Sequence, residues 1–178
     1  MAAVGSLMLT ACGGGAPVPQ VVGPAAPDGF HVLRYPAYGL TLMSPRSWST
    51  VPATAPQVAL VTSGGAVISL WRYRRSGPSP NTLSELQSAL RRLISSARAR
   101  QPTLRLIASR VESVDGRPAL ELETIQRIGQ AIRQVTSTHV FSPAGEIVLE
   151  EYAPQPVFPG LERTVFAPVR RSLTVSAR

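Results

Sequence analysis

Short stretches of alternating hydrophobic and polar residues dominate the first part of the sequence. A period of two puts every second side chain on one face and predicts β-strands that are buried on one side. The residues Ser63-Gly64-Gly65 separate the last two stretches and are typical of a hairpin turn. We therefore predict strands at residues 31–35, 39–43, 57–62 and 66–73.

The spacing becomes helical over residues 83–100. Thr82 and Glu85 have the spacing of a capping box, which predicts that the helix begins just after Thr82. Four arginines fall mostly on the opposite side, so we interpret this segment as a helix on a sheet rather than a separate membrane anchor. The hydrophobic face consists of Leu83, Leu86, Leu90, Leu93, Ile94 and Ala97.

A second group of strand-like stretches follows Pro102. Asp115-Gly116 is a strong hairpin signal, and short turns at Gly129-Gln130 and Pro143-Ala144-Gly145 join the later stretches. Short connections imply antiparallel neighbours. These strands are predicted at residues 104–114, 119–128, 131–142 and 146–152.

The last hydrophobic residues recur at helical spacing. Pro168 interrupts this helix, so the helix either kinks there or restarts with Pro168 in its first turn. The order of elements predicts an α+β fold: an α/β/α sandwich with a central antiparallel sheet, one long helix between two groups of strands and a C-terminal helix. The spaced residues are Leu161, Val165, Phe166, Val169 and Leu173.

The N-terminal segment contains the only cysteine of the chain. Leu9-Thr10-Ala11-Cys12 resembles the lipobox of bacterial lipoproteins, in which the cysteine carries lipid. Residues 1–12 would then be a signal segment, although its usual positive residues are missing, and we expect the true start to lie earlier. Residues 13–29 are rich in glycine and proline and predict a tether, followed by a single domain over residues 30–178. A disulfide within one chain is excluded, and the alternative for Cys12 is an ordinary buried thiol.

The net charge of +8 comes from arginine alone, since the chain contains no lysine. A coding bias towards arginine explains this composition, and attraction to anionic headgroups or acidic envelope polymers is compatible with it. Nucleic-acid binding is not supported, because no zinc-finger, RNP-type or basic-helix pattern is present.

The residues that could do chemistry are few. His31 and His139 are far apart in sequence, no metal-ligating cluster is visible, and we predict neither a metal nor a cofactor. Glu121 and Glu123 would share one face of a strand, where we expect a solvated cross-strand ion pair, for instance with Arg133. Nucleotide-binding and nucleophile-elbow motifs are missing, so we expect a protein that is not an enzyme.

One stretch mixes aromatic and basic residues and is the candidate binding patch. It could contact headgroups, carbohydrate or a protein partner. The alternative is a strand end with one hydrophobic and one charged face. The patch consists of Trp71, Arg72, Tyr73, Arg74 and Arg75.

Three short patches resemble the PsbP-like superfamily, including the LpqN-type lipoproteins of actinobacteria. They are Tyr38 to Leu42 followed by Pro45-Arg46-Ser47-Trp48, the hairpin Val114 to Ala119, and the closing helix from Phe166 to Leu173. The resemblance spans about residues 35–175. It implies an α/β/α sandwich and a non-catalytic binding or assembly role in the cell envelope. It transfers no ligand residues, since the matching patches look structural.

Three functions follow as hypotheses. The first is an envelope lipoprotein, anchored through Cys12 at the outer face of the cytoplasmic membrane, that binds a protein or lipid partner. The second is a carrier of lipid or a small molecule, with a hydrophobic pocket between sheet and helix. The third is an enzyme, which would need polar groups that converge in a cleft around His139.

Overall fold

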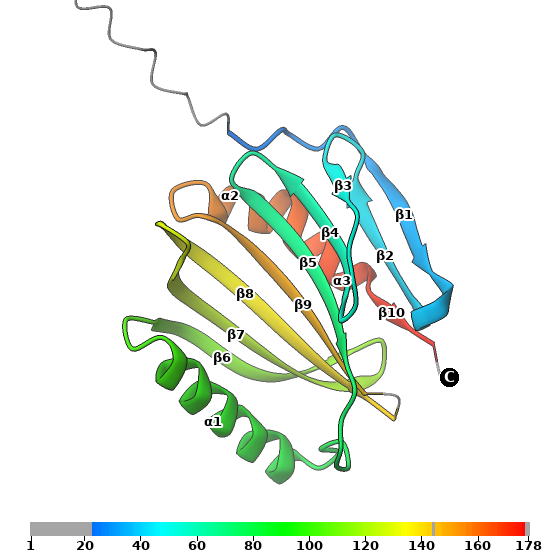
Figure 1. Ribbon diagram of the computed structural model, residues 1–178, viewed down its shortest axis with the longest axis vertical. Coiled ribbons are helices and arrows are strands. Elements are labelled where there is room, and N and C mark those ends of the chain that lie inside the picture. Colours follow the sequence, from blue (N-terminus) through cyan, green and yellow to red (C-terminus); the bar gives the residue numbers. More distant parts are fainter. Residues whose placement is uncertain (1–22, 144, 177–178) are drawn as a thin grey trace, which may run out of the picture.

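The computed structural model describes residues 23–143 and 145–176, and it contains two antiparallel sheets with helices on both sides (Figure 1). A three-stranded sheet has the order β1-β2-β10, and a seven-stranded sheet has the order β3-β4-β5-β9-β8-β7-β6. The strands are β1 (Phe30–Tyr35), β2 (Leu40–Pro45), β3 (Ser49–Val51), β4 (Gln57–Ser63), β5 (Ala66–Tyr73), β6 (Arg105–Val114), β7 (Arg117–Ile128), β8 (Ala131–Ser142), β9 (Gly145–Pro154) and β10 (Thr174–Val175).

The large sheet is assembled from two runs of consecutive strands. Hairpins join β3 to β5 and β6 to β9, and every neighbouring pair is antiparallel. The two runs meet where β5 pairs with β9, with Leu70 opposite Leu149. The strand predictions are therefore confirmed, and the meander folds back so that its last strand lies beside the first run.

Helix α1 (Leu83–Arg100) begins as the capping box predicts. The Thr82 hydroxyl accepts from the backbone N–H of Glu85, whose carboxylate accepts from the backbone N–H of Thr82. The helix packs against β6 and β7, where Leu86 contacts Leu120 and Phe141 in a small hydrophobic cluster. Leu83 belongs to the predicted hydrophobic face, but it is the first residue of the helix and is 62% exposed.

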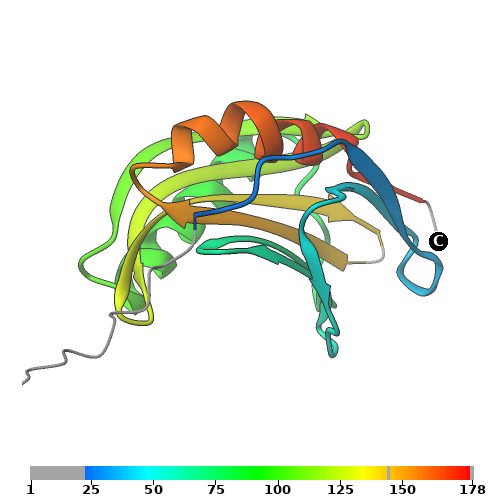
Figure 2. The same ribbon diagram turned by 90° about the horizontal axis from the view of Figure 1, so that it is seen from above.

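The C-terminal helical segment covers the opposite face of the large sheet (Figure 2). It consists of α2 (Phe158–Leu161), one π-helical turn η2 (Glu162–Phe166) and α3 (Ala167–Ser172). Pro168 lies in the first turn of α3, so the predicted interruption takes the form of a restart after the π-helical turn. Phe158, Phe166 and Trp48 form the aromatic centre of the main core beneath it.

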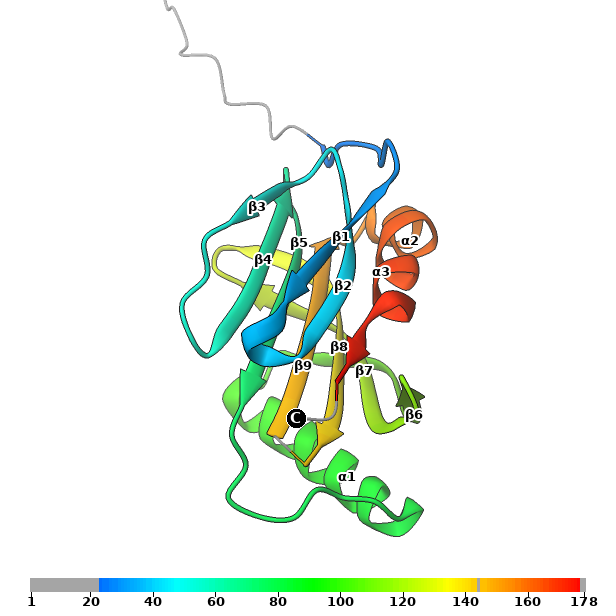
Figure 3. The same cartoon turned by 90° about the vertical axis from the view of Figure 1, so that its right-hand side faces the viewer.

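The small sheet lies beside α3, with the 3-10 turn η1 (Pro36–Tyr38) between its first two strands (Figure 3). The chain from Gly23 onward follows the end of the sheets. The Trp48 indole N–H donates to the carbonyl of Ala25 at 3.0 Å, and Ala25 N–H donates to the Ser63 hydroxyl at 2.8 Å. The last residues of the predicted tether are thus bound to the domain.

Three short elements were not predicted, namely β3, β10 and η1. Each has two or three residues, which is too few for a periodic pattern to show. Within residues 23–143 and 145–176, none of the helices combines the length and hydrophobicity needed to cross a membrane.

Candidate functional site

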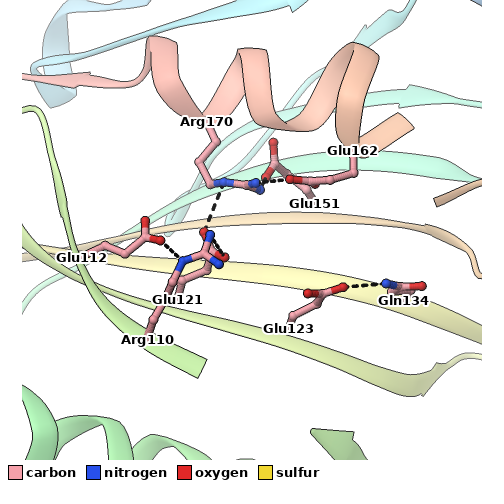
Figure 4. A network of polar contacts seen from close by, with 8 residues as sticks. All are labelled: Arg110, Glu112, Glu121, Glu123, Gln134, Glu151, Glu162 and Arg170. Atoms are coloured by element: carbon pink, nitrogen blue, oxygen red, sulfur yellow. Dashed lines mark hydrogen bonds and ion pairs between the residues drawn. The ribbon is translucent and has the colours of Figure 1, made fainter. Parts of the chain in front are cut away.

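Two groups of polar side chains lie on opposite faces of the large sheet. The first is buried beneath the C-terminal helices and is shown in Figure 4. Arg170 of α3 contacts Glu151 of β9, Glu121 of β7 and Glu162 of η2, and its Nε lies 3.3 Å from a Glu121 oxygen. Arg110 of β6 contacts the other oxygen of Glu121 at 2.6 Å, and it also pairs with Glu112. We call these six residues the buried ion cluster after its centre, since Glu121, Glu151 and Arg170 are buried, whereas Glu112 and Glu162 are partly exposed and Arg110 is exposed at its edge.

The buried ion cluster contains four carboxylates and two guanidinium groups. Glu151 has no solvent exposure, and burial raises its pKa well above the ordinary value, against the lowering effect of Arg170. Burial also raises the pKa of Glu121, although Arg170 and Arg110 oppose this. An excess of buried carboxylate is costly, so the cluster depends on Arg170 for its stability.

Glu121 and Glu123 share one strand face, as predicted, but the predicted solvated surroundings are wrong for Glu121. Glu121 is 4% exposed because the C-terminal helices cover that face. Arg133 lies opposite Gln126 in the register and points to the other face, so the prediction of Arg133 as their partner is wrong. Gln134 instead donates to Glu123, at 2.6 Å (Figure 4).

The second group lies on the face that α1 shares. There α1 covers β6 and β7, whereas the part formed by β5, β9 and β8 is only partly covered. The register places Trp71 opposite Val148, and Val148 opposite His139, so these side chains form one cross-strand row. We call this surface the open face; it consists of Trp71, Tyr73, Ser137, His139, Glu146, Val148, Glu150 and Tyr152.

A chain of hydrogen bonds crosses the open face from Ser137 to Arg75. The Ser137 hydroxyl lies 3.0 Å from His139 Nε2, and His139 Nδ1 lies 2.7 Å from Glu146 Oε1. Arg75 donates to the other oxygen of Glu146 at 2.7 Å. Ser137 and His139 are two residues apart on β8 and therefore share a face, and Glu146 is diagonal to His139 on β9.

The charge state of Glu146 determines the direction of the hydrogen bonds from Ser137 to Glu146. Burial acts to raise the pKa of Glu146, but the hydrogen bonds and charges of His139 and Arg75 outweigh it and lower the pKa. An ionised carboxylate only accepts hydrogen bonds, so His139 Nδ1 must donate to it. In the neutral imidazole, Nε2 is then left to accept the hydroxyl proton of Ser137.

Aromatic rings flank the hydrogen-bonded chain. Trp71 and Tyr73 stack with their ring centroids 6.2 Å apart and their planes 6° from parallel. Tyr73 is 40% exposed, and Tyr152 is half-buried. Burial raises the pKa of Glu150, which lies between Ser69 and Ser137 in the register, despite the charges of His139 and Arg100.

The structure does not bring the predicted binding patch together on one surface. Trp71 and Tyr73 lie on the open face, whereas Arg72 points to the other side and donates to the carbonyl of Tyr38 at 3.1 Å. Arg75 pairs with Glu146 and lies over the ring of Phe141, at 5.1 Å from its centroid, while Arg74 is exposed after the strand ends. Alternation along β5 separates Arg72 from the two aromatic residues, whereas Arg75 lies on the open face with them.

The partners of His139 were not predicted from the sequence. Ser137 lies two residues from His139, but Glu146 is brought to it by the β8–β9 pairing, which the short turn at residues 143–145 already indicated. His31 lies on β1 in the small sheet, away from this face. In the part of the chain that the structure describes, no three His, Cys, Asp or Glu side chains gather as metal ligands. Cys12, the predicted lipidation site, lies outside the described residues.

The space between the large sheet and the C-terminal helices is filled by core side chains. Phe158, Phe166 and Val165 are each at most 1% exposed there. Openings of about 500–580 Å³ lie at the surface instead, one of them lined by Arg75, Pro78, Phe141 and Pro143. The carrier hypothesis predicts a hydrophobic pocket between sheet and helix. Between the large sheet and the C-terminal helices, core side chains fill that space.

The architecture matches solved structures of low sequence identity. It aligns with the cyanobacterial PsbP protein, CyanoP, of Synechocystis sp. PCC 6803, with a TM-score of 0.63 and 17% identity, over 94% of this chain and 99% of that one. The fold is PsbP-like.

Two further structures align less closely with this PsbP-like chain. One is a Pseudomonas aeruginosa protein of unknown function, PA94, described as a putative regulator (TM-score 0.56, 13% identity, 84% of this chain and 99% of that one). The other is LpqN of Mycobacterium tuberculosis, described as involved in cell envelope biogenesis (TM-score 0.46, 14% identity, 86% and 82%). No protein-family model and no curated protein matches the sequence.

Proposed function

We propose that this PsbP-like domain is an envelope protein that binds a protein or lipid partner through its open face. The observation that carries the proposal is the partly exposed aromatic and carboxylate surface on β5, β9 and β8. Trp71, Tyr73 and Tyr152 supply stacking area with little side-chain entropy to lose, which is typical of recognition surfaces.

The open face carries carboxylates although the protein as a whole is positively charged, which supports selective binding of a partner there. The protein as a whole carries +8, yet the exposed Tyr73 lies opposite Glu146 and feels the charges of Glu146 and Glu150. Burial raises the pKa of Tyr73, and both carboxylates raise it further, so the group stays a neutral hydroxyl that can donate to a partner.

Export and anchoring belong to the same proposal. Leu9-Thr10-Ala11-Cys12 has the pattern of a lipobox, and lipid on Cys12 would tether the domain to the outer face of the cytoplasmic membrane. CyanoP and LpqN supply only a comparison of folds here, since their identities to this chain are below 20%.

The intact mass of the protein recovered from its own cell membranes tests the anchoring. We expect a chain that begins at Cys12 and carries acyl groups. Recovery of an unprocessed chain would contradict export and lipidation. A Cys12→Ser variant is the matched control, because it should lose the acyl mass and leave the membrane fraction.

Site-specific photocrosslinking tests the open face. A photoreactive phenylalanine analogue placed at Tyr73 should give a defined adduct in the envelope, identified by mass spectrometry as lipid or protein. The same analogue at Ile107, which is 47% exposed on β6, is the control. Adducts at position 107 but not at 73 would contradict the proposal, and a lipid adduct would favour the carrier over the assembly factor.

A further inference from the structure

Ser137, His139 and Glu146 have the arrangement of a nucleophile, its base and the acid that orients the base. Serine nucleophiles are recognised by this geometry and these roles rather than by their position in a sequence. The two distances, 3.0 Å from Ser137 to His139 and 2.7 Å from His139 to Glu146, lie within hydrogen-bond range. Arg75 donates to the carboxylate oxygen of Glu146 that His139 does not contact, and it thereby holds the carboxylate in place.

The surroundings of the three groups suit a reaction at a partly covered surface. The side chains of His139 and Glu146 are 12% and 20% exposed, so they are largely shielded from water but can be reached from the open face. Ser137 is half-buried beside Glu150, and in the cross-strand row the buried Val148 lies next to His139, followed by the partly exposed Trp71. An ester with a hydrophobic acyl group fits this combination of a nucleophile and an aromatic floor.

We propose that Ser137 is a nucleophile towards acyl esters, with His139 as its general base and Glu146 and Arg75 as positioning residues. The Ser137 oxygen attacks the ester carbonyl carbon, and its proton passes to His139 Nε2. The ester C–O bond then breaks, and His139 returns the proton to the departing alcohol. Water, activated by His139 in the same way, hydrolyses the acyl-serine and releases the carboxylic acid.

We expect stabilisation of the oxyanion to limit the rate of the proposed reaction. Because β8 is paired on both sides, its backbone N–H groups are committed to the sheet, unlike those of a loop-borne oxyanion hole. Among the described residues, the buried indole N–H of Trp71 has no hydrogen-bond partner, and it lies in the same cross-strand row as His139. We therefore expect slow turnover and a more sensitive readout from covalent labelling.

A fluorophosphonate probe tests the nucleophile directly, since serine attack on phosphorus expels fluoride and leaves a stable adduct. The full-length protein should gain one adduct, and peptide mapping should locate it at Ser137. Ser137→Ala should abolish labelling. Ser69→Ala is the matched control, because Ser69 lies two strands away in the same cross-strand row, and it should label normally. A folded wild-type protein that takes no adduct, or takes it elsewhere, overturns the proposal.

Variants of the other two groups separate chemistry from folding. His139→Gln should slow the labelling rate and the hydrolysis of p-nitrophenyl butyrate by about 100-fold or more. Glu146→Gln should slow both, and Glu146→Asp should restore part of the rate, while circular dichroism reports an unchanged fold. Equal esterase rates for the wild type and Ser137→Ala would overturn the proposal. Photocrosslinking at Tyr73 should persist in Ser137→Ala, so failure of the reaction is distinguishable from failure of partner binding.

Discussion

The carboxylate of Glu151 on β9 contacts the guanidinium of Arg170 on α3, and the two residues are 0% and 9% exposed. This pair connects the C-terminal helix to the middle of the large sheet. The remaining carboxylates around Arg170 belong to β7 and η2, so one arginine pairs with carboxylates from three elements. Its removal would leave buried carboxylates without their counter-charge.

We predict that Arg170→Leu lowers the free energy of unfolding by about 3–5 kcal/mol. The physical reason is the desolvation cost of Glu151 and Glu121, which hydrophobic packing by leucine cannot offset. Urea denaturation measures the change. Arg171→Leu is the matched control, because Arg171 is exposed and should change stability by less than about 1 kcal/mol. Similar losses for both variants would contradict the role of Arg170.

Stability should also depend on pH through Glu151. The pKa of Glu151 is raised in the folded state, so the folded protein holds the carboxyl proton more tightly than the unfolded chain does. The resulting stability is fully present below the unfolded pKa of about 4.5. It is lost as the pH rises through the folded pKa. Glu151→Gln cannot lose a proton. We therefore expect the wild type to lose stability relative to Glu151→Gln as the pH rises from about 4.5 through the raised pKa of Glu151, as followed by urea denaturation. A stability difference that does not change with pH would contradict this assignment.

Gly145 leads the chain from the β8–β9 turn into Glu146. Its φ is +136°, and a Cβ atom there would collide with the backbone carbonyl oxygen of Tyr73. We predict that Gly145→Ala costs about 2–3 kcal/mol and slows fluorophosphonate labelling, since it displaces Glu146. Gly129→Ala is the control: it also has a positive φ, of 58°, but open space around it, so thermal unfolding should show a smaller loss.

Trp48 should hold the segment that precedes β1. Its indole N–H donates to Ala25, and its ring packs edge-on against Phe166 with the centroids 6.2 Å apart. We predict that Trp48→Phe keeps most of the packing, costs about 2 kcal/mol, and exposes the residues near Ala25 to proteolysis. Ser49→Ala, on the exposed strand β3, should leave both the stability and the cleavage rate unchanged.

The local patterns of the sequence were sufficient for most of the secondary structure. The alternation in residues 66–73 and the Thr82–Glu85 capping box each depend on neighbours a few positions apart, so they appear directly in the sequence. The order of elements then predicted the α+β class. The interruption at Pro168 was visible as well, because a missing backbone N–H affects only its own helical turn.

The functional groups were decided by tertiary pairing. Glu121 was expected on a solvated face, but α3 covers that face and supplies Arg170 from 49 positions further along the chain. The meeting of β5 with β9 placed Trp71 and Val148 in one row, which no local pattern could predict. His139 acquired Glu146 because the β8–β9 register puts those residues diagonal to each other. Sequence periodicity determines which face a side chain occupies, whereas strand pairing and helix packing determine what that face meets.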